Sequence, residues 1–160
     1  MYNKKSLLVI VCVLSLTSAC KSQLSSYIRP NYLFAGYNGA RLRQQVMLNK
    51  REVWQSNLDS LTDEMTSLPD NQAKAKRQEF LQYRQAIEQK IQVEEARINQ
   101  EILAEINLYI KQYGKNKGYD FILGATENGN IVYAAEGKDI TEDVLNGLNN
   151  KYDQEHPNRP

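Results

Sequence analysis

The stretch LFAGYNGARLRQQVMLNKREVWQSNLDSLTDEMTSL, residues 33–68, decides the fold. Its apolar side chains recur in steps that alternate between four and three residues, which is the heptad pattern of a coiled-coil seam. The pattern stops before Pro69, because proline disfavours helix in the preceding residue and the Asp and Asn that follow favour a turn. Nine of the eleven seam positions are apolar, and the eleven are Leu33, Tyr37, Ala40, Gln44, Met47, Arg51, Trp54, Leu58, Leu61, Met65 and Leu68.

A second helix is predicted over residues 71–113, which contain no glycine or proline. Its apolar side chains repeat every eleven residues, as at Phe80, Ile91 and Ile102. An eleven-residue repeat corresponds to about 3.67 residues per turn, so its seam drifts in the opposite direction to a heptad seam. We therefore expect residues 40–113 to form a fairly straight antiparallel helical hairpin. Its tip should lie near residues 68–72 and pack less tightly than the rest.

The predicted hairpin is balanced in charge as a whole but not locally. Between residues 40 and 112 it carries eleven basic and eleven acidic side chains, whereas residues 41–51 carry four positive charges and no negative charge. Residues 74–77 carry three positive charges. We interpret most of these charges as a solvated helix face.

Short elements are expected on both sides of the hairpin. Residues 27–29 have the composition of a brief strand, and Pro30 suits the first position of a short helix that ends at the glycines around residue 37. Behind the hairpin, residues 119–123 and 131–134 have the pattern of two strands, joined by a hairpin turn at Asn128-Gly129.

A final helix is predicted to begin at Thr141, whose hydroxyl suits an N-cap, and residues 151–160 are expected to be a disordered tail. Elements this small bury little core alone, and a thin hairpin adds seam rather than core. We therefore expect the body, residues 27–39 and 114–150, to gain its core by self-association.

The N-terminus is predicted to be a signal peptide, residues 1–19, with a basic start followed by a short apolar stretch. Small residues lead into Cys20, as in a bacterial lipobox, in which the cysteine thiol receives a diacylglycerol. The alternative is an ordinary signal peptide cut near Ala19, which leaves Cys20 as a free thiol. Residues 20–26 are expected to be a linker.

Composition excludes several functions. The chain has 160 residues with 20 Lys and Arg against 19 Asp and Glu, and this near-neutral balance argues against a nucleic-acid-binding protein. Its one histidine, His156, lies four residues from the C-terminus, which argues against a histidine-ligated metal site and a histidine-based catalytic triad. No glycine-rich phosphate loop is present. We therefore expect no enzymatic activity, no cofactor and no metal.

Four segments together resemble a known family. They are IRPNYLFAGYNGA at 28–40, NKGYDFIL at 116–123, IVYA at 131–134 and DITEDVL at 139–145. In order and spacing they resemble the Skp (OmpH-like) family of periplasmic chaperones, over about residues 27–150. The resemblance implies an α+β fold in which a long antiparallel helical-hairpin (coiled-coil) arm projects from a small β-rich trimerisation body.

The resemblance also implies a function. Members are homotrimers that hold unfolded outer-membrane proteins in a cavity between the arms, without ATP, in the periplasm of Gram-negative bacteria. Here Cys20 would add a lipid anchor in the outer (or inner) membrane, facing the periplasm. Because the chain is nearly neutral, apolar and amide contacts are expected to hold clients more than charge does. The alternative is a membrane-tethered coiled-coil lipoprotein that scaffolds the cell envelope.

Three groups of residues are candidates for these roles. For client binding on the arm they are Trp54, Leu58, Met65, Phe80 and Tyr83, although each could simply pair the two helices. For an anionic-lipid patch they are Lys74, Lys76 and Arg77. For contacts within the body or between subunits they are Ile28, Tyr119, Phe121, Ile122, Leu123, Ile131 and Tyr133.

Overall fold

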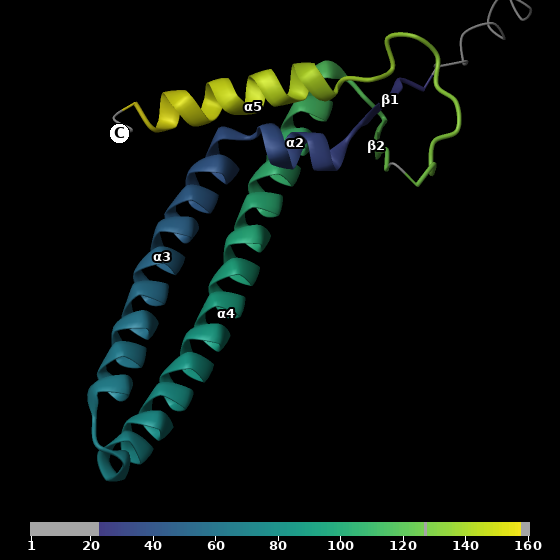
Figure 1. Ribbon diagram of the computed structural model, residues 1–160. Helices are drawn as coiled ribbons and strands as arrows, with labels where there is room; N and C mark the ends of the chain where they lie inside the picture. Colours follow the sequence, from purple (N-terminus) through teal and green to yellow (C-terminus); the bar gives the residue numbers. More distant parts are fainter. Residues whose placement is uncertain (1–22, 127, 158–160) are drawn as a thin grey trace, which may run out of the picture.

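The computed structural model describes residues 23–126 and 128–157, so the predicted signal peptide and Cys20 lie outside the described residues. Two long helices form an antiparallel hairpin that projects from a small body of short helices and strands (Figure 1). The predicted α+β fold with a helical-hairpin arm is confirmed. In chain order the elements are β1 (Ser25–Ile28), α2 (Pro30–Gly36), α3 (Asn38–Ser67), α4 (Asp70–Lys117), β2 (Phe121–Gly124) and α5 (Thr141–Glu155).

The sheet of the body is small and parallel. Strands β1 and β2 pair in the register from Ser25 opposite Phe121 to Ile28 opposite Gly124. On the other side of β1, the Tyr27 N–H donates to the Lys138 carbonyl at 2.9 Å. Since β1 begins at Ser25, the predicted linker over residues 20–26 extended two residues too far.

The predicted β-hairpin of residues 119–123 and 131–134 is wrong. Strand β2 pairs with β1 instead, and residues 131–134 have no regular structure. The loop closes on itself through Asn130, whose side-chain oxygen accepts the Thr126 N–H at 2.7 Å and whose amide donates to the Gly124 carbonyl at 2.5 Å. These bonds of the Asn130 side chain take the place of backbone hydrogen bonds between two strands.

The helix boundaries follow the local sequence at most ends. Pro30 is the first residue of α2, as predicted, and extended Tyr37 separates α2 from α3. Helix α4 runs four residues past the predicted end at 113, through Gly114, and stops where Gly118 adopts a φ of 74°. A Cβ at Gly114 would lie 3.2 Å from the Ile122 side chain, so glycine there allows the helix to pass close to β2.

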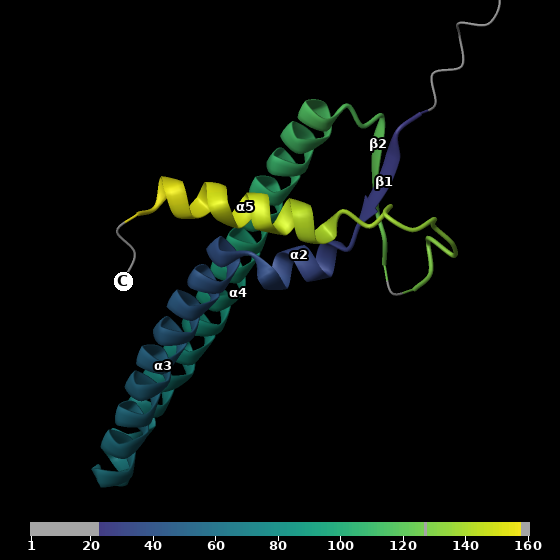
Figure 2. The same cartoon turned by 90° about the horizontal axis from the view of Figure 1, so that it is seen from above.

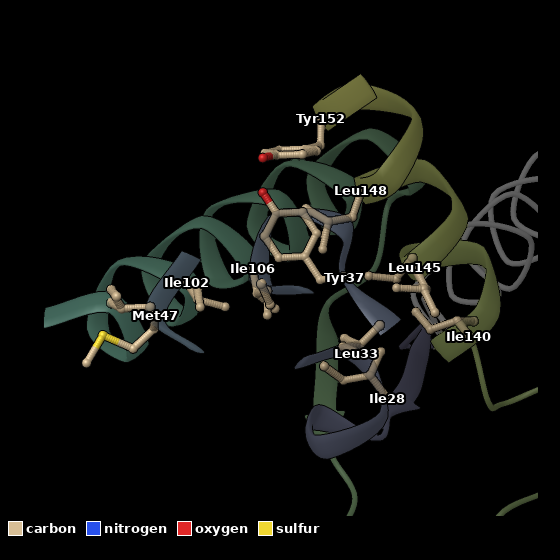
Figure 3. Packing of buried hydrophobic residues seen from close by; sticks show 13 residues of the cluster. Ile28, Leu33, Tyr37, Met47, Ile102, Ile106, Ile140, Leu145, Leu148 and Tyr152 are labelled. Carbon is tan, nitrogen blue, oxygen red and sulfur yellow. The ribbon is translucent and has the colours of Figure 1, made fainter. Parts of the chain in front are cut away.

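The core joins the body to the base of the arm (Figure 3). Met47 of α3 and Ile98, Ile102 and Ile106 of α4 pack with residues of the body, so the expectation that the arm adds only a seam was wrong for its base. The buried cluster consists of Ile28, Leu33, Tyr37, Ala40, Met47, Ile98, Ile102, Ile106, Ile140, Val144, Leu145, Leu148 and Tyr152.

Helix α5 lies across the base of the arm (Figure 2). The predicted disordered tail is wrong for residues 151–155, because Tyr152 is buried and its ring meets that of Tyr37 edge-on at 5.4 Å. The His156 ring stacks on Tyr152 at 4.3 Å just after the helix ends. The predicted capping hydroxyl of Thr141 instead accepts the Arg29 N–H at 3.0 Å, and the Asp139 carboxylate accepts the Thr141 N–H at 2.9 Å.

We predict that Ile102→Ala lowers the free energy of unfolding by about 2–5 kcal/mol, because it leaves a cavity at a fully buried core position. Leu103→Ala, at the next and half-exposed position of the same helix, should change it by less than about 1 kcal/mol. Urea unfolding followed by circular dichroism measures both. Equal losses for the two variants would show that the base of the arm is not part of the core.

Candidate functional site

A charged cluster fixes the base of the arm to the body. The Glu105 carboxylate of α4 accepts a hydrogen bond from the Tyr37 hydroxyl at 2.7 Å and from both terminal guanidinium nitrogens of Arg43, at 2.9 and 2.6 Å. Burial acts to raise the pKa of Glu105, but the hydrogen bonds from Arg43 and Tyr37 together outweigh it and lower this pKa below its ordinary value. Burial and the bond to Glu105 raise the pKa of Tyr37, so its hydroxyl remains a donor.

Similar polar contacts continue along one side of the hairpin. Four residues of α3 spaced seven apart, starting at Arg43, each meet a polar residue of α4. We call this set the polar ladder. Its rungs are Arg43 with Glu105 (2.6 Å), Lys50 with Glu94 (2.7 Å), Asn57 with Tyr83 (3.2 Å) and Glu64 with Lys76 (3.1 Å).

The ladder explains the local charge imbalance of the sequence. Three of the four basic residues in the run over residues 41–51 pair with glutamates of α4, since Arg51 also pairs with Glu95. Lys50 and Arg51 are exposed, as a solvated face requires, but they also pair with α4, while Arg43 is half-buried. Hydrogen bonds from Lys50 and then Arg97 lower the pKa of Glu94 to about 2. Exposed ion pairs contribute less than about 1 kcal/mol each, so the ladder sets the register of the two helices more than their stability.

The five predicted client-binding residues are all half-buried, as their alternative role in pairing the helices requires. Trp54, Leu58 and Phe80 come together at a cavity of about 320 Å³ in the arm. The other two do not line it: Tyr83 belongs to the polar ladder, and Met65 lies nearer the tip. The Lys90 ammonium lies 5.6 Å from the centre of the Trp54 ring.

The predicted anionic-lipid patch is partly neutralised. Lys76 forms ion pairs with Glu79 and Glu64, both at 3.1 Å, and its hydrogen bonds to these carboxylates raise its pKa. Lys74 and Arg77 are exposed. Two of the three charges thus face solvent, while the third is bound to carboxylates of the arm.

The predicted body residues divide between the core and the surface. Ile28 is buried and Ile122 packs against the core, while Tyr119 is half-buried with its ring stacked on Tyr113 at 6.3 Å. Phe121 and Leu123, on the opposite side of β2 from Ile122, are more than half exposed.

The loop after β2 extends this apolar surface. Tyr133 is 86% exposed, and its neighbour Val132, which was not a sequence candidate, is almost fully exposed. Ile131 is half-buried. With Tyr27 and Tyr32 these residues line a cavity of about 520 Å³ between the loop and the start of α2.

Sequence reasoning missed the polar ladder, because equal distances from the turn do not identify its pairs. Arg43 lies 26 residues before Pro69, whereas its partner Glu105 lies 36 residues after it. Lys50 lies 19 residues before Pro69, whereas its partner Glu94 lies 25 residues after it. The register of the two helices therefore had to come from the structure.

Other site types can be tested on the same residues. Across residues 23–126 and 128–157, no group of three or more His, Cys, Asp and Glu side chains is placed to hold a metal ion. Within those ranges, no helix combines the length and the apolar character needed to cross a bilayer.

The structure thus defines a protein with a helical-hairpin arm on a small α+β body, with apolar side chains exposed on both. A family model described as outer membrane protein (OmpH-like) matches residues 26–148. The chain therefore belongs to the OmpH-like outer membrane protein family. The resemblance found in the sequence is confirmed.

One solved structure covers most of the chain. It is the crystal structure of a candidate outer membrane chaperone (OmpH-like) from Caulobacter crescentus CB15, with 14% sequence identity, 81% of this chain and 85% of that chain covered, and a TM-score of 0.43. No curated protein sequence matches the chain.

We predict that Glu105→Gln lowers the free energy of unfolding at pH 7 by about 1–2 kcal/mol, reduced from the full value of a charged hydrogen bond by partial exposure. Because the pKa of Glu105 is lowered on folding, its carboxylate stabilises the fold above pH about 4.5, and this contribution is lost as pH falls through the folded pKa. The free energies of unfolding of the two proteins should converge once the pH falls below the folded pKa of Glu105. The control is Glu101→Gln, which removes an exposed pair within α4 and should change little.

Proposed function

We propose that this protein is an ATP-independent holdase chaperone of the periplasm, which binds unfolded outer-membrane proteins between its arms and prevents their aggregation. Membership of the OmpH-like family supports this proposal. The observation that carries it is the surface of the arm: two helices that share one seam leave many large apolar side chains exposed. They include Val46, Leu48, Leu81, Val93, Leu103 and Leu108.

The proposed mechanism uses many weak contacts. Burial of apolar surface stabilises a contact by about 25 cal/mol per Å², so each side chain contributes little and no fixed geometry is needed. A protein that binds only the unfolded state of its client keeps that client from aggregating without consuming ATP. The near-neutral chain, with 20 basic and 19 acidic side chains, favours apolar and amide contacts over charge.

We propose further that three copies assemble through their bodies. Phe121 and Leu123 of β2 have exposed apolar side chains, and so do Val132 and Tyr133 of the loop that follows β2. Strand β2 pairs with β1 on one side only, and an open strand edge next to exposed apolar side chains favours association. Assembly would bring three arms around a shared cavity.

The proposed site of action is the periplasmic face of a membrane. A signal peptide over residues 1–19 would export the chain, and acylation of Cys20 would hold it at the outer (or inner) membrane. More than one acyl chain gives stable anchoring, since a single chain binds only marginally. Lys74 and Arg77 remain candidates for contact with anionic lipid headgroups.

The holdase proposal predicts that the purified protein suppresses light scattering when a urea-denatured outer-membrane barrel protein is diluted into buffer. Suppression should approach completion at a few-fold molar excess, because many weak contacts act together on each client chain. Serum albumin at equal mass is the control for crowding. Unchanged scattering at several-fold excess would instead favour the scaffolding lipoprotein.

The assembly proposal predicts that sedimentation equilibrium gives about three times the mass of one chain. Leu123→Asp, on the exposed face of β2, should shift the distribution to monomers, because a charge buried at an interface without a partner is strongly destabilising. Val93→Asp, at an exposed position of the arm, is the matched control and should leave the mass unchanged. A compact wild-type monomer at micromolar concentration would contradict the proposal.

A further inference from the structure

The two sides of the arm differ in chemistry. The polar ladder closes one side with Arg43, Lys50, Asn57 and Glu64 of α3. Leu48, Gln55 and Thr62 form a second row of α3 with the same seven-residue spacing. Each lies five residues after a ladder residue, which corresponds to about 140° around the helix. The second row therefore lies on the other flank of the seam.

Two cavities lie along this second row. One, of about 460 Å³, is lined by Met47, Leu48 and Ile98, and the other, of about 320 Å³, is lined by Trp54, Leu58 and other residues of the middle of the arm. Arg51 lines both cavities, so they are adjacent parts of one groove. We call it the open groove, and its apolar lining is Met47, Leu48, Trp54, Leu58, Phe80, Ile87, Ile91 and Ile98.

The rim of the open groove is polar without a dominant sign of charge. It includes Arg51 paired with Glu95 and, farther toward the tip, Arg84 paired with Glu88. The remaining rim groups include the neutral side chains of Gln44, Gln55, Thr62 and Asn99, most of which both donate and accept hydrogen bonds. Such a rim fits an occupant that has backbone N–H and C=O groups to satisfy and no strong net charge.

The length of the open groove suits an extended segment. Its lining runs from Gln44 to Thr62 of α3, a distance of about 27 Å at 1.5 Å per residue. About eight residues of extended chain span the same distance at 3.3 Å per residue. An extended segment also exposes the unpaired backbone groups that the amide rim can bind, whereas a helix satisfies its own.

We propose that the open groove is the side of the arm that receives the client, as an extended apolar segment of an unfolded chain, and that the polar ladder faces away from it. This inference rests on the proposed holdase function and specifies which surface performs it. The ladder holds the two helices in register, and two contacts of groove residues also link α3 to α4: Arg51 with Glu95, and Trp54 with Lys90.

A matched pair of variants tests this inference. Leu48 lines the open groove and is 54% exposed, while Val53 lies on the ladder side, three residues after Lys50, lines neither cavity and is 60% exposed. Leu48→Glu should raise the protein concentration that halves client aggregation by about fivefold or more, because it places a charge in the apolar lining. Val53→Glu should shift it by less than about twofold.

Trp54 provides a second measurement on the unsubstituted protein, because it is the one tryptophan of the chain and lines the open groove. When a tryptophan-free denatured barrel protein binds, acrylamide should quench the fluorescence of Trp54 less, because the client covers the groove.

The outcomes separate the two proposals. Failure of the wild-type protein to suppress aggregation would overturn the holdase function and this inference with it. Suppression that both variants share equally, or quenching of Trp54 that the client leaves unchanged, would overturn the groove alone. Circular dichroism confirms that each variant keeps its helix content.

Discussion

Burial of the α4 isoleucines at the base of the arm is the interaction on which the rest of the structure depends. Ile98, Ile102 and Ile106 pack into the cluster that also contains Leu33 and Leu148 of the body. Because these isoleucines lie on one continuous helix, they both complete the core and fix the direction in which the arm leaves the body. A body with two four-residue strands would otherwise have little to pack against.

The seam and the two flanks of the hairpin differ in chemistry. Apolar seam positions hold the helices together, and polar residues on one flank fix their register through Glu105, Glu94 and their partners. The other flank keeps apolar side chains within reach of solvent. Two paired helices bury only one stripe of each helix. Apolar side chains on a flank outside that stripe therefore add little to the stability of the hairpin and are free to serve the proposed binding.

The sequence determines the arm well and the body poorly, for a physical reason. Helix periodicity and the turn at Pro69 are local, whereas the pairing of β1 with β2 joins residues 96 positions apart. Residues 131–134 have strand composition, but they do not pair with β2. The Asn130 side chain instead bonds to the Thr126 N–H and to the Gly124 carbonyl, next to the end of β2. Tyr152 looked like part of a polar tail because its partner, Tyr37, lies far away in the sequence. Likewise, the heptad pattern predicts the seam from the sequence alone. Which residues face each other on the two flanks depends on the register of the two helices, which only the structure gives.

The unbroken course of α4 has a mechanical consequence. Helix α3 starts afresh after the extended Tyr37, but α4 passes from body to tip through 48 residues without interruption. A rotation of α4 at the buried cluster would therefore be carried to the tip. For an arm of about 45 Å, a rotation of about 10° would move the tip by about 8 Å. The packing of a few buried side chains thus sets where the far end of the arm lies.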